Sequence, residues 1–202
     1  MNLTDKFEKM NILCIDPSLS CTGLFYSGFI SNGDGVIRKT GDKYSYINRI
    51  AKNKTSAKDL QLALINYDIM NRTKEDCDLV IMENYSFGEK KSRSITVLAE
   101  VRGVIKLALY LNGIPYIEVP PQTWMKWSAF GKPMKKSTKK NIADYIAHGK
   151  SIYNLDYKTP DEVDATMIYV ACKNYLQSLD SGVREKKVPE CLIQLEDFVR
   201  KI

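Results

Sequence analysis

The stretch ILCIDPSLSCTGL, residues 12–24, decides the fold that the sequence predicts. Its first five residues are an apolar run that ends in a carboxylate, a pattern typical of a short buried strand. Residues 22–30 (TGLFYSGFI) predict a second strand, which the PSLSC turn joins to the first. A hairpin signal at 32–35 (NGDG) leads to a third strand at 36–39. The chain is therefore predicted to open with a three-stranded antiparallel meander.

Helices and strands alternate beyond this meander. We expect a loop over 39–58, helices over 58–70 and 94–111, strands over 79–83 and 115–119, a helix from Ser137 or Thr138 to Gly149, and a helix over 160–176. Thr159, Pro160 and Glu162 give the last helix a capping box with a favourable proline. Strands linked through helices are usually parallel, so we predict an α/β fold with a mixed five-stranded sheet and helices on both faces. We expect one domain over 1–202, with a core at about 11–177 and a peripheral tail at 178–202.

Composition excludes several classes of protein. The chain has 202 residues, of which 44% are hydrophobic and 27% are charged, as in an ordinary globular domain. Its apolar runs are shorter than the roughly 18 residues that span a bilayer, so we expect a cytoplasmic protein without a membrane partner. None of the five cysteines forms a CxxC pair, and His148 is the single histidine. A metal site would therefore have to be built from carboxylates.

Basic residues gather in two segments of a chain whose net charge is +6. The first cluster is Lys90, Lys91 and Arg93; the second is Lys126, Lys132, Lys135, Lys136, Lys139 and Lys140, with Trp124, Trp127 and Phe130 among them. Lysines interleaved with aromatic residues are typical of a nucleic-acid-binding surface. The alternative is two solvated basic loops.

Four carboxylates are predicted to converge. Asp16 and Glu83 each end a strand, so neighbouring parallel strands would present both at one edge of the sheet. Asp161 and Asp164 share one face of a helix, and Ala165, Ile168 and Cys172 continue that face as an apolar stripe that can pack on the sheet.

Such a cluster implies bound cations. Four close carboxylates repel each other strongly in a low-dielectric cleft, and hard divalent ions such as Mg²⁺ prefer oxygen ligands. Carboxylates beside basic segments therefore indicate hydrolysis of a nucleic acid backbone. Simpler readings exist for two of the acids: Asp161 suits any first helical turn, and Asp16 suits a turn before Pro17.

The same segments resemble the RuvC-type Holliday junction resolvases. ILCIDPSLSCTGL is similar to the opening strand of that family, VIMENY to its second acidic strand, AEVRGVIKLAL to the helix that follows, and PDEVDATMIYVAC to its terminal acidic helix. The matches run in the family's order from about residue 12 to residue 173. Ser18 stands where the family usually has glycine, and 39–58 has no clear counterpart. The divergent, lysine-rich character suits a bacteriophage or a low-GC bacterium.

The resemblance implies an RNase H-like fold, a homodimer and two Mg²⁺ ions per active site, with Mn²⁺ as a substitute. Asp16, Glu83, Asp161 and Asp164 fall on the family's catalytic, metal-binding acids. Lys126 and Lys136 fall where family lysines contact DNA or assist chemistry, and Lys136 is the better match for chemistry. Tyr85 or Phe87 stands where an aromatic residue inserts at the junction centre. The implied activity is paired nicking of a four-way junction, with a 5′-phosphate as product.

Three other functions remain open on sequence alone. A relative of the same fold would cut flaps, branches or RNA–DNA hybrids with the same acids, and a dimer built on the helix at 94–111 would favour junction resolution over it. An actin-like ATP-binding fold would need Gly-rich phosphate loops, which the sequence lacks. The last alternative is a non-catalytic nucleic-acid-binding module in which the acids are structural.

Overall fold

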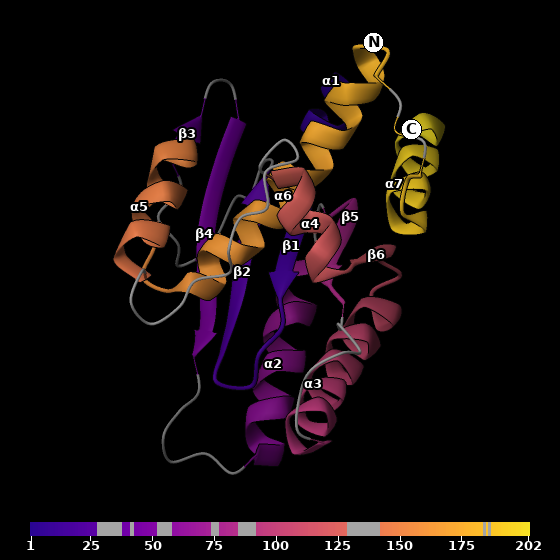
Figure 1. The fold of residues 1–202 in the computed structure, drawn as a ribbon. Helices are drawn as coiled ribbons and strands as arrows, with labels where there is room; N and C mark the ends of the chain where they lie inside the picture. Colours follow the sequence, from indigo (N-terminus) through magenta and orange to yellow (C-terminus); the bar gives the residue numbers. More distant parts are fainter. Residues whose placement is uncertain are drawn as a thin grey trace.

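The computed structural model describes residues 1–27, 38–40, 43–51, 58–73, 77–84, 92–128, 142–183, 185 and 187–202 (Figure 1). The elements in chain order are α1 (Leu3–Lys9), β1 (Ile12–Asp16), β2 (Cys21–Ser27), β3 (Arg38–Thr40), β4 (Lys43–Ala51), α2 (Lys58–Thr73), β5 (Leu79–Glu83), α3 (Ser92–Leu111), β6 (Tyr116–Val119), α4 (Pro121–Ser128), α5 (Ile142–Tyr153), α6 (Pro160–Asp180) and α7 (Glu190–Lys201). None of these helices is long and apolar enough to cross a membrane.

The strands form one mixed sheet in the order β3-β4-β2-β1-β5-β6. The pairs β1–β2, β2–β4 and β3–β4 are antiparallel, whereas β1–β5 and β5–β6 are parallel, so the expected division into antiparallel and parallel halves is confirmed. The expected number of five strands is wrong. β4 lies inside 39–58, which we expected to be a loop, and pairs with β2 along the whole of that strand. Its sequence, KYSYINRIA, mixes polar and apolar residues without strict alternation, which hid it.

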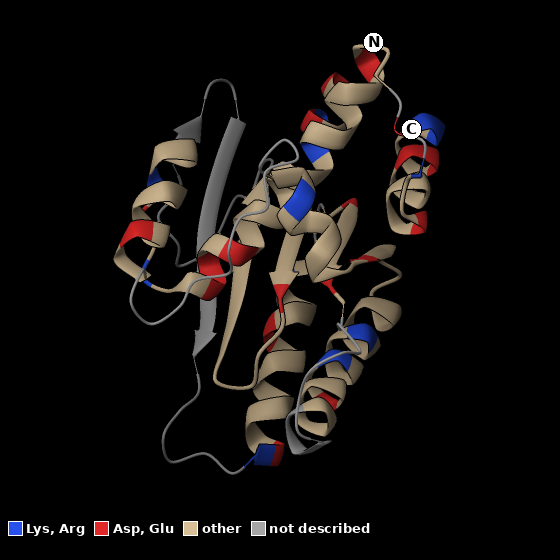
Figure 2. Ribbon diagram, viewed as in Figure 1, with Lys and Arg blue, Asp and Glu red and all other residues tan. Residues whose placement is uncertain are grey.

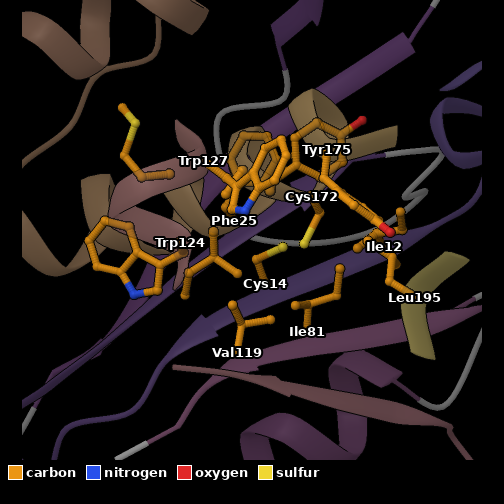
Figure 3. Close-up of a cluster of buried hydrophobic side chains, with 14 of the residues drawn as sticks. Ile12, Cys14, Phe25, Ile81, Val119, Trp124, Trp127, Cys172, Tyr175 and Leu195 are labelled. Atoms are coloured by element: carbon orange, nitrogen blue, oxygen red, sulfur yellow. The ribbon is translucent and has the colours of Figure 1, made fainter. Parts of the chain in front are cut away.

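Two apolar cores lie on opposite faces of the sheet. Alternate strand residues point to opposite faces, so Cys14 and Ile81 belong to the core under α1, α4, α6 and α7, shown in Figure 3. Ile15 and Met82 belong to the other core, under α2 and α3. Helices thus cover both faces, as expected (Figure 1). The stripe of Ala165, Ile168 and Cys172 on α6 packs into the first core, on the same face of the sheet as Cys14 of β1 and Ile81 of β5.

Several element boundaries differ from the expected ones. α3 begins at Ser92, so Ser94 lies inside the helix and does not cap it. α5 continues past Gly149 to Tyr153, and Ser137 and Thr138 fall outside the described residues. The short helices α1 and α4 had no counterpart in the expectation, since neither is long enough to show a helical period.

The first and last helices are attached to the end of α6. The Asp180 carboxylate accepts hydrogen bonds from the backbone N–H groups of Leu3 (2.9 Å) and Thr4 (2.8 Å), and so holds the start of α1. In α7, Leu192 and Leu195 are buried in the same core as Phe7 of α1. The tail that we expected to be peripheral therefore contributes apolar side chains to the core.

Candidate active site

Asp16 and Glu83 lie side by side at the carboxyl ends of two parallel strands. Ile15 of β1 is paired with Met82 of β5, so the next residues along both strands, Asp16 and Glu83, follow at the same level. Neighbouring strands are about 4.8 Å apart, and residues at the same level of a parallel pair point to the same face. That face is the one covered by α4 and α6. The expected meeting of these two carboxylates at one sheet edge follows from this register.

The first turn of α6 contacts β2 beside Asp16. Gly23 of β2 is the direct partner of Asp16 in the β1–β2 pair. A Cβ atom added to Gly23 would lie 2.0 Å from the carbonyl oxygen of Asp161, which is far shorter than any real contact. Only glycine therefore allows α6 to approach this closely. The close approach brings Asp161 and, one turn later, Asp164 to the strand end that carries Asp16.

A capping box sets where α6 begins. The Thr159 side chain accepts a hydrogen bond from the Glu162 N–H, and the Glu162 carboxylate accepts one from the Thr159 N–H (2.8 Å), as the sequence predicted. Asp161 is half-buried in this first turn, and Asp164 is buried one turn further along. The positive end of the helix dipole favours carboxylates at this place.

Tyr145 of α5 places a hydroxyl group among these acids. The buried Tyr145 hydroxyl donates a hydrogen bond to Oδ1 of Asp164. Burial raises the pKa of Tyr145 far above its usual value, and so do the charge and hydrogen bond of Asp164 and the charges of Asp16 and Glu83. Carboxylates from β1, β5 and α6 therefore all raise the pKa of this one hydroxyl group. Sequence patterns could not identify this residue, because its partner is 19 residues away on another helix.

Trp124 of α4 holds the remaining strand acid. Its indole Nε1 donates a hydrogen bond to Oε2 of Glu83 at 3.1 Å, while its ring is fully buried in the core (Figure 3). Trp127, one turn later, is also buried and contacts the ring of Tyr175 edge-on. Both tryptophans were expected among the lysines of a nucleic-acid-binding surface. Their burial excludes them from base stacking in this structure and gives Trp124 a contact with the site instead.

The turn after β1 is closed by side chains. The Thr22 hydroxyl donates to the Ser18 carbonyl at 2.6 Å and accepts from the Ser18 N–H at 3.2 Å. Ser18 also contacts the Ser20 hydroxyl at 3.1 Å. Ser18, the departure from the family pattern, is thus accommodated by a hydrogen-bonded turn next to Asp16.

The donor chemistry at this edge fits a hard divalent cation, because all four candidate ligands are carboxylates. Figure 2 shows acidic residues at the end of β1 and in the first turns of α6. Within the described residues, however, no three His, Cys, Asp or Glu side chains are arranged closely enough to hold an ion. The four residues offer the kind of oxygen that such a cation prefers, and Tyr145 and Trp124 donate hydrogen bonds to two of these carboxylates.

Most of the candidate DNA-binding residues fall outside the described part of the chain. Lys126 is described: its Nζ lies 2.6 Å from Oε2 of Glu185 and 5.6 Å from the centre of the Trp127 ring. Outside the described residues lie Tyr85, Phe87, Lys90, Lys91, Lys132, Lys135, Lys136, Lys139 and Lys140, and the Arg93 side chain is not described either. Both basic segments are nevertheless adjacent in sequence to described residues of the candidate site. Residues 85–91 follow Glu83 by one residue, and 129–141 connects α4 to α5.

The sheet, the two helical layers and the strand-end acids define the class of protein: an α/β protein of the RNase H-like fold with an acidic site on one sheet edge. No family model matches the chain. It is 26% identical over 178 residues to the crossover junction endodeoxyribonuclease RuvC of Gloeobacter violaceus, across 87% of this chain and 94% of that relative.

Solved RuvC structures share the fold. Thermus thermophilus RuvC superposes with a TM-score of 0.58 at 15% identity, covering 83% of this chain and 96% of that one. The same enzyme in complex with a Holliday junction substrate also gives a TM-score of 0.58, at 12% identity, over 83% of this chain and 95% of that one. The resemblance to RuvC is thus confirmed in sequence and in fold: the chain is similar to a curated RuvC over most of its length and shares the fold of solved RuvC structures.

Proposed function

We propose that this protein is a structure-specific DNA endonuclease that resolves four-way junctions by paired nicking, as part of DNA recombination or repair. The observation that carries the proposal is the arrangement of Asp16, Glu83, Asp161 and Asp164 on β1, β5 and α6 of a RuvC-like fold. A protein acting on bacterial or phage DNA in this way would work in the cytoplasm of a bacterial or phage-infected cell.

The four carboxylates are the proposed ligands of two Mg²⁺ ions, for which Mn²⁺ would substitute. Bound ions would activate the attacking water and stabilise the leaving oxygen. The product of this hydrolysis would carry a 5′-phosphate. Asp16 has carboxylate neighbours on both sides, Glu83 on β5 and the first turn of α6 next to Gly23, and this central place suits a metal ligand. Lys136, in the segment between α4 and α5, would stabilise charge on the phosphorane.

Branched DNA would be bound by the two basic segments that adjoin the site. Lys90, Lys91, Arg93, Lys126, Lys132, Lys135, Lys139 and Lys140 are the proposed phosphate contacts. Tyr85 or Phe87, which both follow Glu83 within four residues, would insert at the junction centre, as the resemblance to RuvC-type resolvases implies. Binding through phosphate contacts releases counterions, so affinity should fall steeply as salt rises. Lys126 would have to exchange its ion pair with Glu185 for a phosphate.

A homodimer would supply two such sites at fixed spacing, as symmetric nicking requires. The outer face of α3 supports it: the side chains of Leu107, Tyr110 and Leu111 are 51%, 81% and 58% exposed. The adjacent helix α2 exposes Leu60, Leu64 and Tyr67. Apolar residues gathered on one surface are typical of an interface. The alternative is a general branch, flap or hybrid nuclease of the same fold, which needs no dimer.

Cleavage of labelled substrates distinguishes these functions. A four-way junction, a flap, a duplex and an RNA–DNA hybrid are each incubated with the protein in Mg²⁺ and then in EDTA. We expect paired nicks in the junction only, with Mg²⁺ only. Equal cutting of the flap or hybrid would favour the general nuclease.

Removing one acid tests the site itself. Asp164→Asn should abolish cleavage, whereas Asp197→Asn makes the same change at an exposed position of α7 and should leave cleavage intact. An Asp164→Asn protein that cuts as fast as the parent would exclude the metal site. Lys136→Ala should turn over weakly while still binding junctions; lost binding with normal turnover of bound DNA would contradict its proposed role.

A further inference from the structure

Two neutral donors contact the acids of the candidate site, and the resemblance gave neither of these residues a role. The Tyr145 hydroxyl of α5 binds Asp164, and the Trp124 indole of α4 binds Glu83. Tyr145 is 6% exposed and Asp164 3%, so their hydrogen bond is shielded from water. Trp124 is fully buried, and its acceptor Glu83 is half-buried. A buried hydrogen bond to a charged acceptor is among the stronger ones in proteins, and it fixes the rotamers of both partners.

We propose that Tyr145 and Trp124 are positioning residues of this nuclease, which orient Asp164 and Glu83 for metal binding. The inference rests on the proposed function, since it assigns these two acids to a metal site. A carboxylate has two oxygens with about four acceptor positions, so one donor fixes its orientation and leaves it able to bind an ion. Outer hydrogen-bond partners of this kind hold metal-binding carboxylates in many sites.

A neutral donor suits this task better than a cation would. A lysine or arginine would cancel part of the negative charge that attracts the metal ion, whereas a hydroxyl or indole N–H orients the carboxylate and leaves its charge in place.

Other buried aromatic residues in the same core show that packing alone does not require these contacts. Tyr169 is buried on α6, and its hydroxyl accepts a hydrogen bond from Ser27 at 3.1 Å. The buried Nε1 of Trp127 makes no hydrogen bond to any described residue. Tyr169 and Trp127 are therefore matched controls. Each has the same ring as a proposed positioning residue, but the Tyr169 hydroxyl is bound to Ser27 and Trp127 Nε1 has no hydrogen-bond partner among the described residues.

The contacts also tie both helices to the site. α4 and α5 are the two helices that the lysine-rich segment 129–141 connects, and each carries one of the donors. Each of these two hydrogen bonds therefore joins one of the helices to one acid of the candidate site.

The test measures metal binding without DNA and without turnover. Mn²⁺ is titrated into the full chain by calorimetry for the parent and for Tyr145→Phe, Trp124→Phe, Tyr169→Phe and Trp127→Phe. We expect the first two to bind Mn²⁺ about 10- to 100-fold more weakly, the range found for loss of an outer hydrogen-bond partner, and the two controls to bind it as the parent does. Junction cleavage by Tyr145→Phe should then recover as Mg²⁺ is raised.

A double variant separates positioning from a general loss of structure. In the Asp164→Asn background, Tyr145→Phe should weaken Mn²⁺ binding little further, because the group it orients is gone. Parental Mn²⁺ affinity in Tyr145→Phe, or a full additional loss in the double variant, would overturn the positioning role. Failure of the proposed function would look different: Asp164→Asn alone would then bind Mn²⁺ and cut junctions like the parent.

Discussion

Gly23→Ala should separate the two halves of the candidate site with one methyl group. The added Cβ would lie 2.0 Å from the Asp161 carbonyl oxygen, 2.3 Å from its carbonyl carbon and 2.8 Å from the Glu162 nitrogen. All three are backbone atoms, so no side chain can rotate away to relieve the clash. Real contacts of this kind are at least about 3.0 Å, so the first turn of α6 must move from β2 by about 1 Å.

Two effects of different size should follow from this displacement. Overpacking costs roughly 1–3 kcal/mol of folding stability, which urea unfolding would measure. A misplacement of about 1 Å among reacting groups costs about 100-fold in rate, or about 2.7 kcal/mol of transition-state stabilisation. Single-turnover cleavage of a labelled four-way junction at saturating protein would measure that loss, and gel-shift binding in Ca²⁺ should change little.

Gly103→Ala is the control for the unfolding measurement. A Cβ at Gly103 would meet no heavy atom within 4 Å, so this variant should gain up to about 1 kcal/mol from the helix propensity of alanine. Gly23→Ala that remains folded and cleaves at the parental rate would refute the idea that close contact of α6 with β2 assembles the site.

Three further outcomes are expected. Asn174→Ala should lower the free energy of unfolding by about 1–3 kcal/mol, because the buried Asn174 amide donates hydrogen bonds to the two carbonyls at the end of α4. Urea unfolding would measure this loss of stability. Burial raises the pKa of Asp180, but hydrogen bonds from α1, chiefly those of Thr4, bring it below its ordinary value. The stability that Asp180 contributes is therefore present above about pH 4 and lost as pH falls through the lower folded pKa. Asp180→Asn should unfold more readily than the parent at pH 6, and the difference should shrink as the pH falls below about 4. Leu107→Asp should shift the protein from dimer to monomer in light scattering and reduce paired nicking to single nicks, whereas a parent that is already monomeric would contradict the proposed interface on α3.

The elements that the sequence predicted well are those with a strong local pattern. β1 and β5 are continuous apolar runs, and the start of α6 follows from Thr159 and Glu162, whose side chains cap it as the sequence indicates. β4 escaped prediction because a strand with many polar residues looks like a loop until its partner β2 is known. For the same reason, local sequence patterns could not predict the strand order β3-β4-β2 at this edge of the sheet.

The residues of the candidate site also fall into those with a strong local sequence pattern and those without one. Asp16 and Glu83 could be paired from sequence, because each acid ends an apolar strand and parallel neighbours present such residues together. Gly23, Trp124 and Tyr145 could not. Their roles depend on tertiary contacts with groups 19 to 138 residues away: the Asp161 backbone, Glu83 and Asp164. Tertiary contacts of this kind produce no periodic pattern in the sequence from which they could be predicted.

The attachment of α1 to the far end of α6 has a practical consequence. α6 has 21 residues, so it is about 30 Å long, with Asp161 and Asp164 at one end and Asp180 at the other. Both chain ends lie near the Asp180 end, where Lys6 Nζ donates to the Arg200 carbonyl at 3.3 Å (Figure 1). A fluorophore or surface tether at either terminus would therefore sit about a helix length from the acids. Single molecules could be immobilised there while the edge proposed to receive DNA stays open.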